Sequence, residues 1–326
     1  WNGTSWFEIN DLNTAVRNNT GAGTNTAALS FGGLIAGATR TANTETWNGS
    51  NWTEVNDLNA ARRGLAGIGT ATSALGVGGN PTGSGTPVVS SNEAYNGTSW
   101  TEVGDLNTAR TTSGSAGVDN TSGLVFGGAP YSGVTESWNG SSWTEVADLN
   151  TARGLLGSSG IQTSALAFGG YPPALAVTES WNGSSWTEVN ALSIGRTEFV
   201  GAGATNLAAL AAGGEISGGR TAATEEFTAG AIGDKIINEG EVYFNTATNL
   251  IKLSKKVFGA GAWAAGGNLN TARRNLGGTG TQTAALAFGG NNGSALGVTE
   301  TYDGSSWSEV ADLNTVRFGL GSANAA

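Results

Sequence analysis

The residues of this chain that could do chemistry are chiefly carboxylates and arginines. The 326-residue sequence contains no histidine and no cysteine, so the usual general base and the thiolate ligands of metal sites are missing. Paired glutamates could still hydrolyse glycosidic bonds, but an active site should appear as a local departure from the internal repeat. The acids that depart from it are Asp119, Glu198, Glu215 and Glu226, and they form no recognisable motif. We therefore expect a non-enzymatic protein with no catalytic residues, no cofactor and no metal.

One arginine and one glutamate recur in every repeat. The arginines end connections of the type "LNTAR" and lie at Arg17, Arg62, Arg110, Arg153, Arg196, Arg273 and Arg317. The glutamates occupy a predicted strand, at Glu45, Glu93, Glu136, Glu179, Glu225 and Glu300. Because both recur with the repeat, we predict that they form a structural ion pair or a bracket for the backbone.

Two further acidic series also follow the repeat. The glutamates of the last predicted strand, such as Glu188 in "WTEV", are predicted to be solvated and to discourage edge-to-edge aggregation. The aspartates of "DLN", such as Asp148, are predicted to cap a turn through their own backbone. Neither series therefore indicates a reaction.

The elements that position these residues follow from a repeat marked by glycine pairs. The second glycines are Gly33, Gly79, Gly128, Gly170, Gly214 and Gly290, at intervals of 46, 49, 42, 44 and 76 residues by subtraction. In the fourth unit, "GLLGSSG", "TSALAFGG", "VTESW" and "SSWTEV" read as four short strands, with a hairpin turn at Asn182-Gly183. Four-stranded units of about 45 residues predict an all-β propeller with the small-residue strand innermost. Glycine interrupts every helical period, so helix is nearly excluded.

The repeated wording is similar to a known family. The "AFGG" glycine pair, the aromatic residue of "ESW" and the Trp of "SSWTEV" resemble the kelch repeat of β-propellers. The longer wording "NTAR…GTQTAALAFGG…TESWNGSSWTEV" resembles kelch-like repeats of marine bacteriophage tail-fibre and other virion proteins. The segment from "GEVYFNTATNLIKL" through "GAWAAGGNLNTAR" resembles pieces of phage fibre proteins. The resemblance implies a kelch-like propeller in a virion structural protein. The copper-oxidase branch of such propellers uses histidine and cysteine, which this chain lacks.

Counting the repeats predicts seven blades. Six complete units run from about Thr14 to Asn314, while residues 1–13 supply only the third and fourth strands of another unit and residues 315–326 only its first. We expect both chain ends to close this seventh blade, whose second strand would follow Ala326 in a longer parent chain. The lack of methionine at position 1 also indicates an excerpt. Residues 1–326 are predicted to form one propeller domain, with a β-hairpin inserted at about 233–258 in the fifth complete blade.

Variation is concentrated between the second and third strands, where loops on a rigid scaffold commonly carry recognition. The residues predicted to bind a ligand there are Arg40, Tyr131, Tyr171, Arg220 and Asn291. The alternative is that these loops are surface segments that vary freely. The insertion carries a second predicted contact, with an acidic partner, through Tyr243, Lys252, Lys255 and Lys256. Those lysines could equally serve only to keep an exposed hairpin soluble.

The net charge of −10 argues against nucleic-acid binding, which needs clustered cations, and the sequence has no run of about 18 apolar residues for membrane insertion. We therefore expect a non-enzymatic phage appendage or tail-fibre-type adhesin on the virion surface, contacting a host-surface glycan or protein through the loop face. Other virion proteins and further copies of the chain, in a homo-oligomer, are the remaining expected partners. The alternatives are a purely structural virion module and a carbohydrate-active propeller enzyme.

Overall fold

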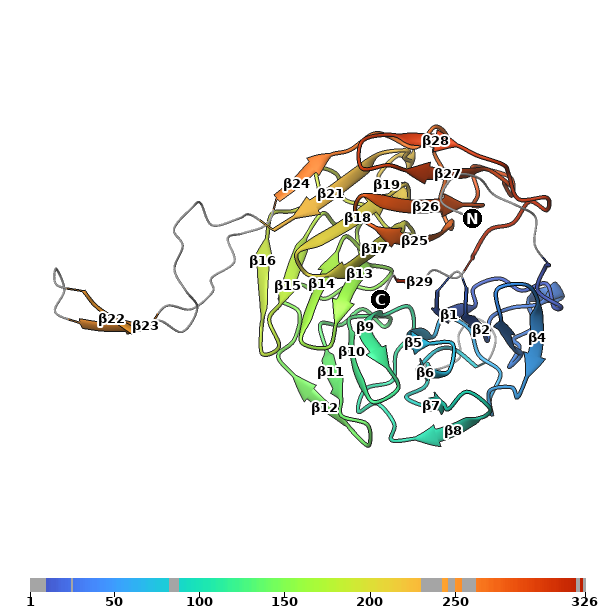
Figure 1. The fold of residues 1–326 in the computed structure, drawn as a ribbon, viewed down its shortest axis with the longest axis horizontal. Helices are drawn as coiled ribbons and strands as arrows, with labels where there is room; N and C mark the ends of the chain where they lie inside the picture. Colours follow the sequence, from blue (N-terminus) through green and yellow to red (C-terminus); the bar gives the residue numbers. More distant parts are fainter. Residues whose placement is uncertain are drawn as a thin grey trace.

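The computed structural model describes residues 10–24, 26–81, 88–229, 242–245, 250–253, 262–320 and 323–324. These residues form a ring of six four-stranded antiparallel sheets, each with its first strand at the centre and its fourth strand at the rim (Figure 1). The predicted all-β propeller is therefore confirmed. A single turn of 3-10 helix, Ala36–Ala38, is the only helix among the described residues.

The blades follow one another along the chain. Blade 1 contains β1 (Thr20–Gly23), β2 (Ala28–Phe31), β3 (Thr44–Trp47) and β4 (Trp52–Val55). Blade 2 contains β5 (Ala66–Thr70), β6 (Ser73–Val77), β7 (Asn92–Tyr95) and β8 (Trp100–Val103). Blade 3 contains β9 (Gly114–Asp119), β10 (Ser122–Phe126), β11 (Thr135–Trp138) and β12 (Trp143–Val146).

The second half of the ring repeats this order, with additions. Blade 4 contains β13 (Gly157–Ile161), β14 (Ser164–Phe168), β15 (Thr178–Trp181) and β16 (Trp186–Val189). Blade 5 contains β17 (Val200–Thr205), β18 (Ala208–Ala212), β21 (Thr224–Thr228) and β24 (Ala262–Ala265), with a small β19 (Glu215–Ile216) and β20 (Gly219–Arg220) pair in its loop. Blade 6 contains β25 (Gly277–Thr281), β26 (Ala284–Phe288), β27 (Thr299–Tyr302) and β28 (Trp307–Glu309), joined by β29 (Ala323–Asn324).

Tryptophan holds each blade to the one before it. In blade 4, Trp181 and Trp186 are cross-strand partners on either side of the Asn-Gly turn, with ring centroids 5.3 Å apart. The Trp186 ring also lies 4.8 Å from that of Phe126 in blade 3, and its indole N–H donates to Thr135 Oγ1 at 3.0 Å. The buried apolar clusters accordingly combine residues of neighbouring blades, so no blade buries its apolar faces by itself.

The blade count corrects the prediction of seven. In place of a seventh sheet, β29 alone pairs in parallel with β25 and lies beside β1 in blade 1 (Figure 1). Among the described residues, no second strand lies between this inner strand and an outer pair, so β29 adds to the sheet of blade 6 through β25. The expected outer strands fall partly in residues 1–9, which lie outside the described residues.

Backbone hydrogen bonds between the blade connections close the ring without a seventh sheet. Seven connection residues have φ between 51° and 68°: Asn18, Gly64, Thr112, Leu155, Glu198, Asn275 and Gly319. Most donate their N–H to the carbonyl of the preceding member, and Asn18 donates to Gly319, which in turn donates to Asn275 at 2.8 Å. The connections on either side of the gap are therefore bonded to each other. The glycine-rich inner strands surround a central cavity of about 250 Å³.

Candidate functional site

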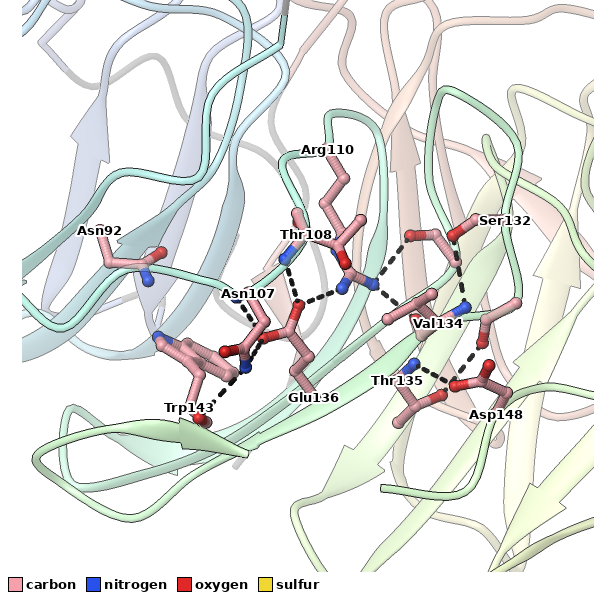
Figure 2. Close-up of polar contacts among 12 residues, drawn as sticks. Asn92, Asn107, Thr108, Arg110, Ser132, Val134, Thr135, Glu136, Trp143 and Asp148 are labelled. Atoms are coloured by element: carbon pink, nitrogen blue, oxygen red, sulfur yellow. Dashed lines mark hydrogen bonds and ion pairs between the residues drawn. The ribbon is translucent and has the colours of Figure 1, made fainter. Parts of the chain in front are cut away.

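The repeated charged residues form a buried frame, shown for blade 3 in Figure 2. Arg110 pairs with Glu136, and both side chains are almost completely buried. The other carboxylate oxygen of Glu136 accepts hydrogen bonds from the backbone N–H and side-chain amide of Asn107 at 2.7 and 2.8 Å. Arg110 also donates to the carbonyl of Val134. This pair therefore fixes a blade connection against the second and third strands of the next blade.

The same frame recurs in five blades. The pairs are Arg62 with Glu93, Arg110 with Glu136, Arg153 with Glu179, Arg196 with Glu225 and Arg273 with Glu300. Burial lowers the pKa of the Arg153 guanidinium, and its hydrogen bond to Glu179 opposes that shift. Since both side chains of each pair are buried against each other, the predicted structural ion pair is confirmed for these five blades.

Arg17 and Arg317 do not belong to this frame, which corrects the prediction. Arg62, Arg110 and Arg153 lie five positions after the Asp of "DLN", and that position after Asp11 is Val16. Arg17 therefore occupies the next position, equivalent to Arg63 and Arg274, and its guanidinium lies over the Phe318 ring. Glu45 stays buried and, within the described part of the chain, accepts hydrogen bonds from Asn13 and Thr14. Arg317 occupies the frame position but is one-third exposed, 3.4 Å from Asp11.

The aspartates of "DLN" have a different role from the one predicted. Asp148 Oδ1 accepts the backbone N–H of Thr135 at 3.1 Å, and Asp57 and Asp312 accept the equivalent N–H groups of Thr44 and Thr299. Each therefore caps the start of the third strand of its blade. The connection passes the start of that strand, which places the carboxylate beside the first backbone N–H of the strand. The glutamates of the fourth strand, such as Glu188, are exposed as predicted.

The variable loops and the blade connections emerge on one face, which we call the loop face. Isolated backbone bridges join a connection to the residue after each glycine pair, as between Gly154 and Tyr171. Tyr131 of blade 3 and Tyr171 of blade 4 meet on this face with ring centroids 5.2 Å apart and planes at 64°. Both rings remain accessible, at 43% and 41% exposure. Partial burial, and then the nearby Tyr171, raises the pKa of Tyr131.

The other predicted ligand residues lie on separate blades. Arg40 follows the short helix of blade 1 and donates to Asn80 Oδ1 of blade 2 at 3.2 Å. Arg220 lies in β20, opposite Glu215 of β19. Asn291 of blade 6 accepts the N–H of Gly293 at 2.8 Å. The loop face thus holds all five residues, but only the two tyrosines are in contact with each other.

Each acid outside the repeat forms an ion pair or a hydrogen bond with a neighbouring residue. Glu198 and Glu215 both pair with Arg274. Glu226 accepts the hydroxyl of Tyr302, whose pKa is raised by burial and by this carboxylate. Asp119 accepts hydrogen bonds from Thr121 and Ser122 in its own hairpin turn.

The insertion in blade 5 replaces the turn between β21 and β24. Its hairpin consists of β22 (Val242–Asn245) and β23 (Leu250–Leu253), with Tyr243 opposite Lys252. Figure 1 shows this hairpin projecting outward from the rim. Lys255 and Lys256 lie outside the described residues, and a partner contact through the insertion stays a prediction. In the described part of the chain, no helix has the length and apolar character needed to cross a bilayer.

Sequence reasoning missed the arginines of the position after the buried frame, Arg63 and Arg274, and misplaced Arg17. Counting from the leucine of "DLN" or "NLN" would have found them, because these three arginines each lie five positions after it. Backbone bridges put Arg17 beside Leu34 and Arg63 beside Asn80, on the loop face.

Comparison with known proteins adds no family. No model of a protein family matches the chain, and no curated protein matches it either. The resemblance to kelch repeats and phage fibre proteins therefore depends on the repeat residues alone.

Proposed function

We propose that this chain is a non-enzymatic adhesin module of a phage-type virion appendage, which binds a host-surface glycan or protein through its loop face. The observation that carries this proposal is the exposed Tyr131–Tyr171 pair. Two tilted rings from adjacent blades offer an accessible apolar surface with phenolic hydroxyls at its edge, a combination suited to contact with sugar rings or a peptide. The frame of buried ion pairs holds these rings in place before a ligand arrives.

The phage assignment draws on the resemblance of the repeats to kelch-like propellers of virion proteins. Weak binding by one module suits such a particle, because many copies on one virion raise the effective concentration of the sites. A purely structural virion module is the main alternative. It predicts no binding to cells or glycans in any form of the purified protein.

The test measures binding to a glycan array and to bacterial cells. It compares the purified wild-type protein with a Tyr131→Ala/Tyr171→Ala variant. We expect at least a tenfold loss, since each exposed aromatic anchor contributes about 1 kcal/mol or more. The matched control is Val118→Ala/Ile161→Ala. These side chains are similarly exposed, at 43% and 37%. They lie at the ends of the inner strands β9 and β13 that point away from the loop face.

The control should bind like the wild type. Equal binding by the tyrosine variant would contradict the assignment of the site, and no binding by any protein would favour the structural module. Release of shorter sugars from a bound glycan would instead indicate the carbohydrate-active enzyme.

A further inference from the structure

Three arginines gather on the loop face where blades 1 and 2 meet. The backbone of Leu34 bridges both Arg17 and Arg40, and the backbone of Arg63 bridges Asn80. Arg40 reaches across the two blades, because its Nη2 donates to Asn80 Oδ1 at 3.2 Å. These contacts bring three arginines from three separate segments together on this face, with the Arg17 guanidinium over the Phe318 ring and the charges of Arg40 and Arg17 near Arg63. We call Arg17, Arg40 and Arg63 the arginine cluster.

No described carboxylate neutralises the cluster. None of its three members takes part in an ion pair among the described residues. The Nε atoms of Arg40 and Arg63 are buried without a hydrogen-bond partner there. Burial lowers the pKa of Arg63, and the nearby charges of Arg40 and Arg17 lower it further. The cluster therefore concentrates positive charge in a chain whose net charge is −10.

Blade 5 provides an internal comparison for this place. Arg274 is the residue equivalent to Arg63, and it pairs with both Glu215 and Glu198. The residues equivalent to these acids in blade 1 are Leu34 and Asn18, which carry no charge. The same site of the repeat thus pairs its arginine with two acids in one blade and leaves it without an acid in another, although the Nε of Arg274 also lacks a hydrogen-bond partner.

We propose that the arginine cluster binds an anionic group of a surface glycan, a carboxylate or a sulfate. This proposal rests on the proposed function, because the cluster lies on the loop face and specifies which glycans that face selects. Guanidinium groups match the planar oxygens of carboxylates and the oxygens of sulfates with paired N–H donors. A nucleic acid fits less well, since tracking its phosphates requires more cations than this acidic chain offers.

The probes are dextran sulfate for sulfate, alginate for carboxylate, and neutral dextran as the uncharged control. Binding is measured by biolayer interferometry at low and high salt. We expect wild-type protein to bind at least one charged polymer, neutral dextran at least tenfold more weakly, and both charged probes less well as salt rises. Arg40→Gln and Arg63→Gln should each weaken binding about tenfold, the loss of one charge-assisted contact.

Two further variants separate the cluster from general charge effects. Asn18→Glu introduces the acid that blade 5 carries at Glu198, which has the same φ of 52°. It should weaken binding about tenfold while all three arginines remain. Arg274→Gln removes the same charge from the equivalent position of blade 6, and should change binding less than twofold. Thermal melting of each variant confirms that it is folded.

The outcomes distinguish this proposal from the function on which it rests. If Arg63→Gln and Arg274→Gln weaken binding equally, or if neutral dextran binds as well as the charged polymers, the arginine cluster is not an anion site. The adhesin proposal survives that result when the tyrosine variant still loses binding on the glycan array. If neither charged polymer binds and the array is also empty, both proposals fail.

Discussion

Replacing Arg153 with valine tests the buried frame most sharply. Arg153 and Glu179 are both fully buried and paired. The arginine also donates to the carbonyls of Thr151 at 2.8 Å and Ala167 at 3.1 Å. Glu179 in turn accepts the backbone N–H and side-chain amide of Asn150 at 2.6 and 2.7 Å. The substitution removes the cation and leaves these amide contacts to the buried carboxylate.

The expected loss of stability depends on the hydrogen bonds that the buried Glu179 carboxylate retains. Removing one partner of a buried ion pair commonly costs about 3–5 kcal/mol. Blade 1 carries the natural counterpart, because Val16 replaces the arginine while Glu45 keeps its hydrogen bonds to Asn13 and Thr14. We therefore expect the Arg153→Val protein to fold and to lose about 3 kcal/mol in its free energy of unfolding, the lower end of that range.

Urea denaturation followed by tryptophan fluorescence measures this loss. The Arg153→Val/Glu179→Gln double variant should regain part of the stability, because it no longer buries an unpaired charge. Glu188→Gln, on the exposed rim strand, should change the free energy of unfolding by less than about 0.5 kcal/mol. If Arg153→Val also lowers the free energy of unfolding by less than about 0.5 kcal/mol, the reasoning is refuted, because the buried frame would then contribute no more than a surface charge.

Three further predictions follow from the frame and its turns. In urea denaturation, Gly128→Ala should lower the free energy of unfolding by at least about 1 kcal/mol more than Gly293→Ala does. A Cβ at Gly128 would lie 2.8 Å from the Thr111 carbonyl, whereas a Cβ at Gly293 would have no atom within contact distance. Equal losses for the two variants would contradict this prediction. Hydrogen bonds from Ser306 and Ser305 lower the pKa of the Asp303 carboxyl to about 2. The ionised carboxylate therefore stabilises the fold above a pH of about 4, and this contribution is lost as the pH falls toward about 2. An NMR titration midpoint near 4 would contradict this prediction. Replacing residues 228–262 with Asn-Gly-Ser-Ser should restore the turn of the other blades and leave the circular dichroism spectrum and melting temperature nearly unchanged, whereas loss of the β signal would show that the insertion supports the ring.

The repeat made most of the fold predictable. Alternating residues around Asn-Gly turns and paired glycines fixed four strands per unit, and the small residues of β5 and β13 indicated a crowded axis. Their need for small size is visible at Gly67, where a Cβ would lie 2.7 Å from the carbonyl of Gly21 in the preceding blade. The pairing of arginine with glutamate followed from their common period alone.

Features that depend on the relation between blades were less predictable. Val16 occupies the position of the buried arginines, and the arginine beside it, Arg17, was mistaken for one of them although its guanidinium lies over the Phe318 ring. The blade count was wrong because complementary fragments at the two ends do not make a sheet without a central strand. The Tyr131–Tyr171 contact joins two loops whose separation no spacing rule provides.

Hydrogen–deuterium exchange of the wild-type protein, with and without the strongest glycan from the array, tests the central claim most directly. The account predicts slower exchange in the segments between the second and third strands, at residues 34–43, 129–134 and 171–177, because the ligand covers the loop face. The turns between the third and fourth strands, such as residues 182–185, should exchange at unchanged rates. Protection of those turns instead, or no protection anywhere in the presence of bound glycan, would contradict the claim that the loop face is the binding surface.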